Sequence, residues 1–124
     1  MAMVKTYRDL VAWQKAMQLA KAVYRATSRM PAGERFGLTL QIRRATVSIP
    51  SNIAEGFGRQ SRADLLKFLR IARGSLNEVS TQLELAIELG MLRTDSNLDS
   101  LLRETDRVLQ GLIRSLERKG SVGG

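Results

Sequence analysis

Arginine and lysine side chains are the residues of this chain whose types and grouping could do chemistry. The sequence holds 20 Lys and Arg against 12 Asp and Glu, with no His, which gives a formal net charge of +8 and a pI near 10.8. Arginine outnumbers lysine, and the planar guanidinium group binds phosphate through paired hydrogen bonds. The balance favours an anionic partner, with nucleic acid first and an acidic membrane surface second.

The densest basic segment lies at the start of the third predicted helix. Its first half holds several Lys and Arg with the single acid Asp64, whereas its second half holds three Glu and no Lys or Arg. This polarity opposes the helix dipole, so something other than local helix stability selects it. We predict nucleic-acid contacts at Arg59, Arg62, Lys67, Arg70 and Arg73, supported by Arg43 and Arg44.

Two other interpretations of these charges stay open. The basic half of this helix could dock on the acidic half of the same helix in a second subunit, which would make the chain an oligomeric interaction scaffold. The charges could also form ordinary solvated faces, as on the first predicted helix, where the basic residues fill the arc opposite its apolar stripes.

Aromatic side chains give no platform on which single-stranded bases could stack. Trp13 and Tyr24 fall on the predicted core stripe of the first helix, and only Tyr7, Phe36 and Phe57 are expected to be accessible. No motif for reading base edges is visible either. Any nucleic acid is therefore expected to be recognised through its backbone and shape, with a strong dependence on salt.

Catalytic chemistry is not expected. The chain has no Cys and no His, which removes thiol catalysis, the commonest general base and the commonest transition-metal ligand. Glu84 and Glu88 share a helical face, but a carboxylate-bundle metal site also needs histidine. Gly56 and Gly58 are too few for a phosphate-binding loop, and no base accompanies Ser48. We expect no enzyme activity, no cofactor and no metal.

The length of 124 residues and the hydrophobic fraction of 44% are those of one globular domain. We assign this domain to residues 1–119 and a flexible tail to residues 120–124. No apolar run approaches the roughly 18 residues needed to span a bilayer, and the first residues have no signal-peptide core. A cytoplasmic protein with no membrane partner is therefore expected.

Helix starts are marked three times by a hydroxyl residue followed three positions later by an aspartate. Thr6, Ser61 and Ser96 are the expected N-caps, and each precedes a run with helical apolar spacing. Gly90 is the expected C-terminal cap of the third helix. The expected helices cover residues 7–28, 34 or 36 to 57, 62–89 and 98–118.

Apolar residues alternate at spacings of four and three along the third and fourth helices, the seam pattern of helix bundles. In the first helix the expected stripe is Leu10, Trp13, Met17, Ala20 and Tyr24, with Ala12, Ala16, Leu19 and Val23 beside it. Four helices with short connections predict an all-α, antiparallel, up-down-up-down four-helix bundle.

The segment 43–59 interrupts this regularity with a proline inside a helix. Pro50 removes one backbone hydrogen bond, so a kink is expected there, with Ser48, Ser51 and Asn52 supplying compensating hydrogen bonds. Gly56 and Gly58 are expected to permit a tight exit from this helix. Glu55 is expected to pair with Arg43, Arg44 or another helix. Gly74 is expected to allow close approach of a neighbouring helix.

These motifs resemble those of the four-helix-bundle proteins encoded in intervening sequences of large-subunit ribosomal RNA genes. The resemblance rests on an Asp-Leu plus Trp-Gln-Lys opening at residues 9–15, the segment Ser48-Ile49-Pro50 to Glu55-Gly56, and Gly74-Ser75. Relatives of that family include the accessory proteins of diversity-generating retroelements. Ser48, Pro50, Asn52, Glu55, Gly56 and Gly74 are the structural signature residues.

The resemblance implies a homo-oligomer, expected to be a pentamer, in a nucleic-acid context. Its implied partners are RNA or DNA and, in the retroelement setting, a reverse transcriptase. Surplus apolar residues outside the seams, such as Ile71 and Leu85, also favour self-association.

Overall fold

Four long α-helices account for most of the computed structural model, which describes residues 4–123, with the side chains of residues 4–119. The elements in chain order are the 3₁₀ turn η1 (Tyr7–Asp9), α1 (Val11–Thr27), the 3₁₀ turn η2 (Ala32–Glu34), α2 (Leu38–Gly58), α3 (Arg62–Glu88) and α4 (Ser96–Gly123). No strand occurs among the described residues. The predicted all-α class and the four helices are therefore confirmed.

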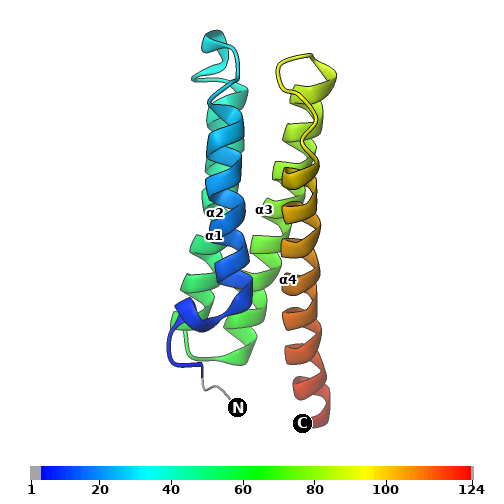
Figure 1. Cartoon of the computed structure of the whole chain (residues 1–124). Helices are drawn as coiled ribbons and strands as arrows, with labels where there is room; N and C mark the ends of the chain where they lie inside the picture. Colours follow the sequence, from blue (N-terminus) through cyan, green and yellow to red (C-terminus); the bar gives the residue numbers. More distant parts are fainter. Residues whose placement is uncertain (1–3, 124) are drawn as a thin grey trace.

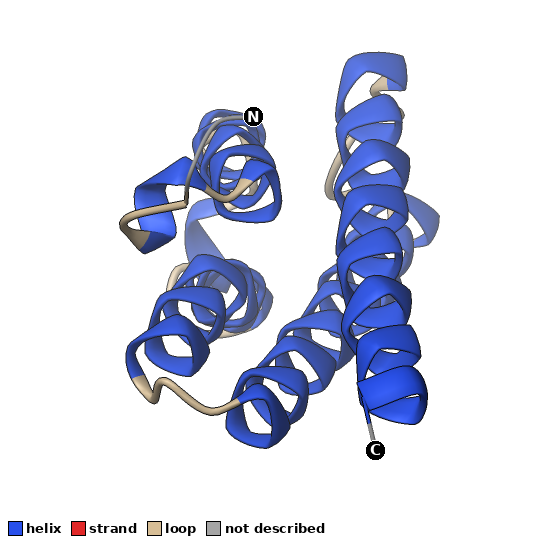
Figure 2. Cartoon of the chain, turned by 90° about the horizontal axis from the view of Figure 1, so that it is seen from below, coloured by secondary structure: helices blue, strands red, loops and turns tan. Residues whose placement is uncertain are grey.

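The helices lie side by side along the long dimension of the molecule (Figure 1). Both termini and the α2–α3 connection lie at one end, and the α1–α2 and α3–α4 connections lie at the other. Seen along this dimension, the chain forms a ring of four helices (Figure 2). Helix α1 contacts α2 and α4, and helix α3 contacts the same two, with the most extensive contact between α2 and α3.

The core runs through the middle of this ring. Each helix contributes a fully buried side chain of large volume, namely Leu19, Ile49, Leu76 and Leu109. The predicted seam of α3 is confirmed from Leu69 to Ala86, since every one of its members in that interval is buried. The seam of α4 is buried at Leu98, Thr105 and Leu109 and half-buried at the positions between.

Helix α1 turns a different face to the core from the expected one. Ala12, Ala16, Leu19 and Val23 are buried, whereas Trp13 is half-buried and Tyr24 keeps 42% of its surface exposed. The two stripes are neighbours on the helix, and the one with small side chains lets α1 approach both α2 and α4 closely. The larger side chains of the expected stripe, such as Trp13 and Tyr24, then lie at the edge of the contact between α1 and these two helices.

The first helix also begins later than expected. Thr6 and Asp9 do form the predicted capping box, but this box caps the start of the short turn η1 and not that of α1. Leu10 follows in an extended conformation, with φ −75° and ψ 125°, so α1 starts at Val11 without a side-chain cap. The side-chain amide of Gln14 donates to the Arg8 carbonyl at 2.8 Å and joins the turn to the helix.

The starts of α3 and α4 are set by hydroxyl and carboxyl caps. Ser61 Oγ accepts from the Asp64 N–H at 3.0 Å, as predicted. The cap of α4 is Asp95 and not Ser96, because Asp95 Oδ1 accepts from the Asn97 and Leu98 N–H groups. Helix α2 begins at Leu38 because the turn η2 occupies the earlier residues.

The C-terminal ends of α3 and α4 can be compared with the predicted glycine cap and the predicted tail. Gly90 has φ +74°, and the N–H of Met91 reaches back to the Ala86 carbonyl at 2.9 Å, so the predicted glycine stop is confirmed. Helix α4 continues to Gly123, into the segment 120–124 assigned to a tail, and Gly124 lies outside the described residues. Within the described part of the chain, no helix is long and apolar enough to cross a membrane.

Candidate nucleic-acid interface

The contact between α2 and α3 places the predicted arginines, and Gly56 is where the two helices come closest. A Cβ built on Gly56 would lie 2.7 Å from Phe68 Cβ and 3.4 Å from Leu65 Cα. Helix α2 runs on to Gly58, so Gly56 serves helix contact rather than the predicted tight exit. At Gly74 no other helix of the chain makes the predicted close approach, because a Cβ built there has no atom of another segment within 4 Å.

The signature residues beside Pro50 form a small polar cluster between the same two helices. Ser48 Oγ and Ser75 Oγ are 2.8 Å apart, and Asn52 Nδ2 donates to both the carbonyl and the hydroxyl of Ser48. Pro50 itself is buried. Pro50 has no N–H, so the Thr46 carbonyl lacks its usual helical donor. Asn52 supplies a local hydrogen bond, as predicted, but to the Ser48 carbonyl and not to that of Thr46.

Arg43 is used inside the fold. Its Nε donates to Thr27 Oγ1 at 3.0 Å, its Nη2 donates to the Tyr24 carbonyl at 3.3 Å, and its guanidinium carbon lies 4.5 Å from the centre of the Tyr24 ring. These contacts tie α2 to the C-terminal end of α1, where the helix dipole favours a cation. Arg44, the next residue, is exposed.

The turn between α2 and α3 carries Arg59 and Arg62. Arg59 Nη2 lies 3.0 Å from Glu55 Oε1, so Glu55 pairs within its own helix end and not with Arg43 or Arg44 as expected. The left-handed residue of the turn is Gln60, with φ 63°, and not a glycine. Arg62 is exposed and its side chain forms no hydrogen bond or ion pair with any residue that the structure describes.

Arg70 and Arg73 are paired with carboxylates of α4 in the same chain. Arg70 Nη2 lies 3.4 Å from Glu117 Oε2, and Arg73 Nε lies 3.2 Å from Asp106 Oδ1. Gln110 donates to the second oxygen of Asp106 at 2.6 Å. Two cations in the first half of α3 are thus matched by acids of the neighbouring helix α4.

Lys67 completes the set of predicted site residues. It is exposed, and its Nζ lies 6.0 Å from the centre of the Phe68 ring without a carboxylate partner among the described residues. The structure therefore leaves Arg44, Arg62 and Lys67 uncompensated and places Arg43, Arg59, Arg70 and Arg73 in contacts within the chain. Arg44 lies on the middle part of α2, and the other two lie on the first turns of α3.

A row of cations along α1 and just beyond it was not among the predicted site residues. Lys21 and Arg25 lie four residues apart on one face of α1, and Arg29 follows four residues later, just beyond the end of the helix. All three are exposed and form no side-chain ion pair with the described carboxylates. Lys15, earlier on this helix, lies 3.6 Å from Glu104 of α4. The four-residue spacing of these cations is visible in the sequence. Only the folded structure shows that they have no carboxylate partner among the described residues.

The pKa of the exposed Asp9 carboxyl is lowered because the N–H groups of Lys5 and Thr6 donate to the carboxylate. Over residues 4–119, no group of three or more metal-ligating side chains gathers into a candidate site. The arrangement is suited to binding anions at exposed arginine and lysine side chains.

Comparison with known proteins supplies the family. The family model of the 23S rRNA-intervening sequence proteins matches residues 8–114. A crystal structure of a protein of unknown function from the S23 ribosomal protein family of Bacteroides thetaiotaomicron aligns with a TM-score of 0.73 and 29% identity, covering 84% of this chain and 96% of that one. No curated protein matches the chain. Because the family match spans most of its length, this chain belongs to the 23S rRNA-intervening sequence protein family.

Proposed function

We propose that this chain is a non-enzymatic, self-associating helical-bundle protein that binds structured RNA or DNA through the phosphate backbone. The observation that supports this most is the number of uncompensated surface cations. Lys21, Arg25, Arg44, Arg62 and Lys67 are exposed and form no ion pair with the described carboxylates. Exposed cations without carboxylate partners bind phosphate at little desolvation cost.

The interface for this function is made of two groups of residues. Arg62 and Lys67 lie on the first turns of α3, and Arg44 lies on α2. Lys21 and Arg25 form the second group, on α1. None of these side chains has a carboxylate partner among residues 4–119. The family name refers to an intervening sequence of 23S rRNA, which makes RNA the first nucleic acid to test.

The architecture behind this proposal is an antiparallel up-down-up-down bundle whose second helix bends at Pro50. The positions of the termini and connections support the antiparallel order (Figure 1). The bend follows from the missing N–H of a proline inside α2. A crystal structure tests it through the angle between the axes of residues 38–49 and 51–58, and a straight axis would contradict it.

An interaction scaffold is the second candidate function. Ile71 and Leu85 on α3 and Val47 on α2 each keep more than 40% of their side-chain surface exposed, at 43%, 45% and 44%. Ile71 and Leu85 are separated by two seven-residue repeats, so they lie on the same face of α3. These apolar residues favour a homo-oligomer, for which we propose a pentamer, and a partner protein such as a reverse transcriptase would use the remaining charged faces.

A salt series separates the two candidates. Binding of a structured RNA hairpin and of a DNA duplex is measured by fluorescence anisotropy from low to physiological salt. The double variant Arg62→Glu/Lys67→Glu is compared with Arg107→Glu/Lys119→Glu, which makes the same charge change on exposed residues of α4. Losing two phosphate contacts on duplex DNA is expected to flatten the slope of log K against log salt by roughly 1.8.

Oligomer mass is followed in the same samples. A flatter slope for the α3 variant alone, with the mass unchanged, supports nucleic-acid binding. Loss of the assembly in that variant supports the scaffold function instead. Absence of wild-type binding at low salt, where the electrostatic attraction is strongest, would end the nucleic-acid proposal.

A further inference from the structure

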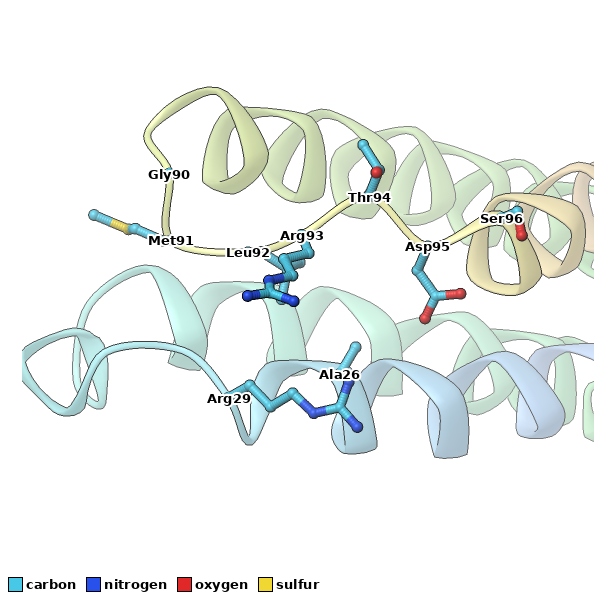
Figure 3. Close-up of a pocket in the computed structure, with 9 residues that line it drawn as sticks. All are labelled: Ala26, Arg29, Gly90, Met91, Leu92, Arg93, Thr94, Asp95 and Ser96. Atoms are coloured by element: carbon cyan, nitrogen blue, oxygen red, sulfur yellow. The ribbon is translucent and has the colours of Figure 1, made fainter.

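A pocket of about 510 Å³ lies between the end of α1 and the α3–α4 connection. Arg29 lines it from the turn just beyond the end of α1, and Arg93, Thr94, Asp95 and Ser96 line it from the connection and the start of α4. In Figure 3, the Arg93 side chain extends from the connection toward the end of α1, and the Arg29 side chain runs along that end toward Ala26. The pocket is at the opposite end of the molecule from Arg62 and Lys67.

Neither arginine has a partner of opposite charge. No ion pair or side-chain hydrogen bond involves Arg29 or Arg93 among the residues that the structure describes. This differs from Arg70 and Arg73, each of which lies within 3.4 Å of a carboxylate oxygen. Asp95 also lines the pocket but forms no ion pair with either arginine, so both guanidinium groups keep donors for an added anion.

The presence of Arg29 and Arg93 in the pocket is not explained by the stabilisation of helix ends. A cation near the C-terminus of α1 would be favoured by the helix dipole, but Arg43 already donates to the Tyr24 carbonyl there. Arg93 belongs to no helix. Asp95, the acid of the pocket, uses Oδ1 to accept from the Asn97 and Leu98 N–H groups and so neutralises the start of α4.

The backbone holds both arginines in place. Arg93 follows the Gly90 turn and Leu92, which packs against the core, and it precedes the cap residue Asp95. Arg29 lies between the last turn of α1 and Met30, which is buried. Because the flanking residues are fixed, binding an anion orders only the two side chains, and this lowers its entropic cost.

We propose that this pocket binds a phosphate monoester, with the Arg29 and Arg93 guanidinium groups on the phosphate oxygens. Two guanidinium forks present more donors than the two oxygens of a carboxylate accept, and a phosphate offers three oxygens and a larger charge. The Thr94 and Ser96 hydroxyls form no hydrogen bond within the described residues and add neutral donors. The volume accommodates the group that the phosphate carries, as ligand pockets of this size do.

The phosphate has two sources with the same chemistry, a free small molecule or the 5′ end of a nucleic-acid strand. Isothermal titration calorimetry of the full chain therefore uses three probes. These are inorganic phosphate, a trinucleotide with a 5′-phosphate, and the same trinucleotide with a 5′-hydroxyl. Titrations are made at constant ionic strength set by chloride. Variants Arg29→Gln and Arg93→Gln are compared with Arg107→Gln, an exposed arginine outside the pocket.

We expect wild-type protein to bind the 5′-phosphorylated trinucleotide at least ten-fold more tightly than its hydroxyl form. Each pocket variant is expected to lose that difference, and Arg107→Gln to keep it. Equal affinity for inorganic phosphate and the phosphorylated strand assigns the pocket to free phosphate, and tighter binding of the strand assigns it to strand ends. Circular dichroism checks folding, and Arg93→Lys, which keeps the charge but not the fork, gives a second variant.

Two results would overturn the proposal. One is the absence of phosphate-dependent heat in the wild-type protein, and the other is equal weakening by Arg107→Gln and the pocket variants. The proposal does not depend on the nucleic-acid interface, because Arg44, Arg62 and Lys67 do not line the pocket. Failure of one therefore leaves the other standing, since the salt series uses strands without terminal phosphate.

Discussion

Gly56 and Gly74 are chemically identical residues with opposite roles. At Gly56, an added Cβ would meet Phe68 Cβ at 2.7 Å, and the contact cannot be relieved by rotating a flexible side chain. We expect Gly56→Ala to destabilise the protein by about 1–3 kcal/mol, because α2 and α3 must move apart to accept the methyl group. The free energy of unfolding from urea denaturation measures this.

Gly74→Ala is the matched control for that variant. Gly74 lies inside α3, and no atom of another segment lies within 4 Å of a Cβ built there. Alanine is expected to raise the free energy of unfolding by about 0.5–1 kcal/mol, since it restricts the unfolded chain and favours helix. Equal effects of the two substitutions would show that the α2–α3 contact at Gly56 is not tight.

Asp9 gives the protein a pH dependence that can be traced to one residue. Its pKa lies below the usual 3.8 because the Lys5 N–H, and then the Thr6 N–H, donate to the ionised carboxylate. A lowered pKa in the folded state stabilises the fold above pH 3.8, and this stabilisation is lost as the pH falls through the folded-state pKa.

Asp9→Asn is therefore expected to be less stable than the wild-type protein at neutral pH. The difference should shrink once the pH falls below 3.8, where the wild-type carboxyl also becomes neutral. Urea denaturation at a series of pH values measures both proteins. A difference that stays constant down to strongly acidic pH would mean that the carboxylate does not stabilise η1.

At the scale of elements, Arg43 joins two helices. Its hydrogen bonds to Thr27 Oγ1 and the Tyr24 carbonyl, at 3.0 and 3.3 Å, link α2 to α1. We expect Arg43→Gln to lower the free energy of unfolding by about 1 kcal/mol, because the charge-assisted bonds of a partly exposed side chain are lost. The salt dependence of nucleic-acid binding should not change in this variant.

Arg44→Gln is the control for Arg43→Gln, because the next residue is exposed and forms no ion pair with the described side chains. It should leave stability within about 0.5 kcal/mol of the wild-type value and flatten the salt slope. The opposite assignment, with Arg43 controlling binding and Arg44 controlling stability, would contradict the contacts seen at the α1–α2 interface.

At the scale of the whole molecule, we propose that the exposed apolar face of α3 mediates assembly. We expect light scattering on the wild-type protein to give about five times the chain mass of 13.8 kDa. Leu85→Glu should weaken association by at least roughly ten-fold, which corresponds to about 1.4 kcal/mol, because a charge would be buried in the contact. A wild-type mass of one chain would refute the assembly.

Ser80→Glu adds the same charge to a different face of α3 and serves as the control for Leu85→Glu. It should leave the oligomer mass unchanged. If the two substitutions weaken association equally, net charge rather than the apolar face controls assembly.

Local signals in the sequence predicted the elements well where one helix contains all the relevant residues. Ser61 caps α3, Gly90 ends it, and the seam from Leu69 to Ala86 is buried as the spacing indicated. A capping bond spans three residues and a seam repeats every seven, so the chain itself encodes both. The first helix was placed less well because it carries two adjacent apolar stripes of similar strength.

The partners of charged side chains were decided by the tertiary structure alone. Arg70 and Arg73 meet Glu117 and Asp106, and Arg43 meets the end of α1, although nothing within one helix distinguishes them from Arg62 or Lys67. Arg29 and Arg93 likewise come from segments far apart in sequence and line one pocket. Sequence determined the composition, the charge and the helical periods, because these depend on neighbours along the chain. Which cations remain free for a ligand depends on groups far apart in sequence, and only packing brings those together.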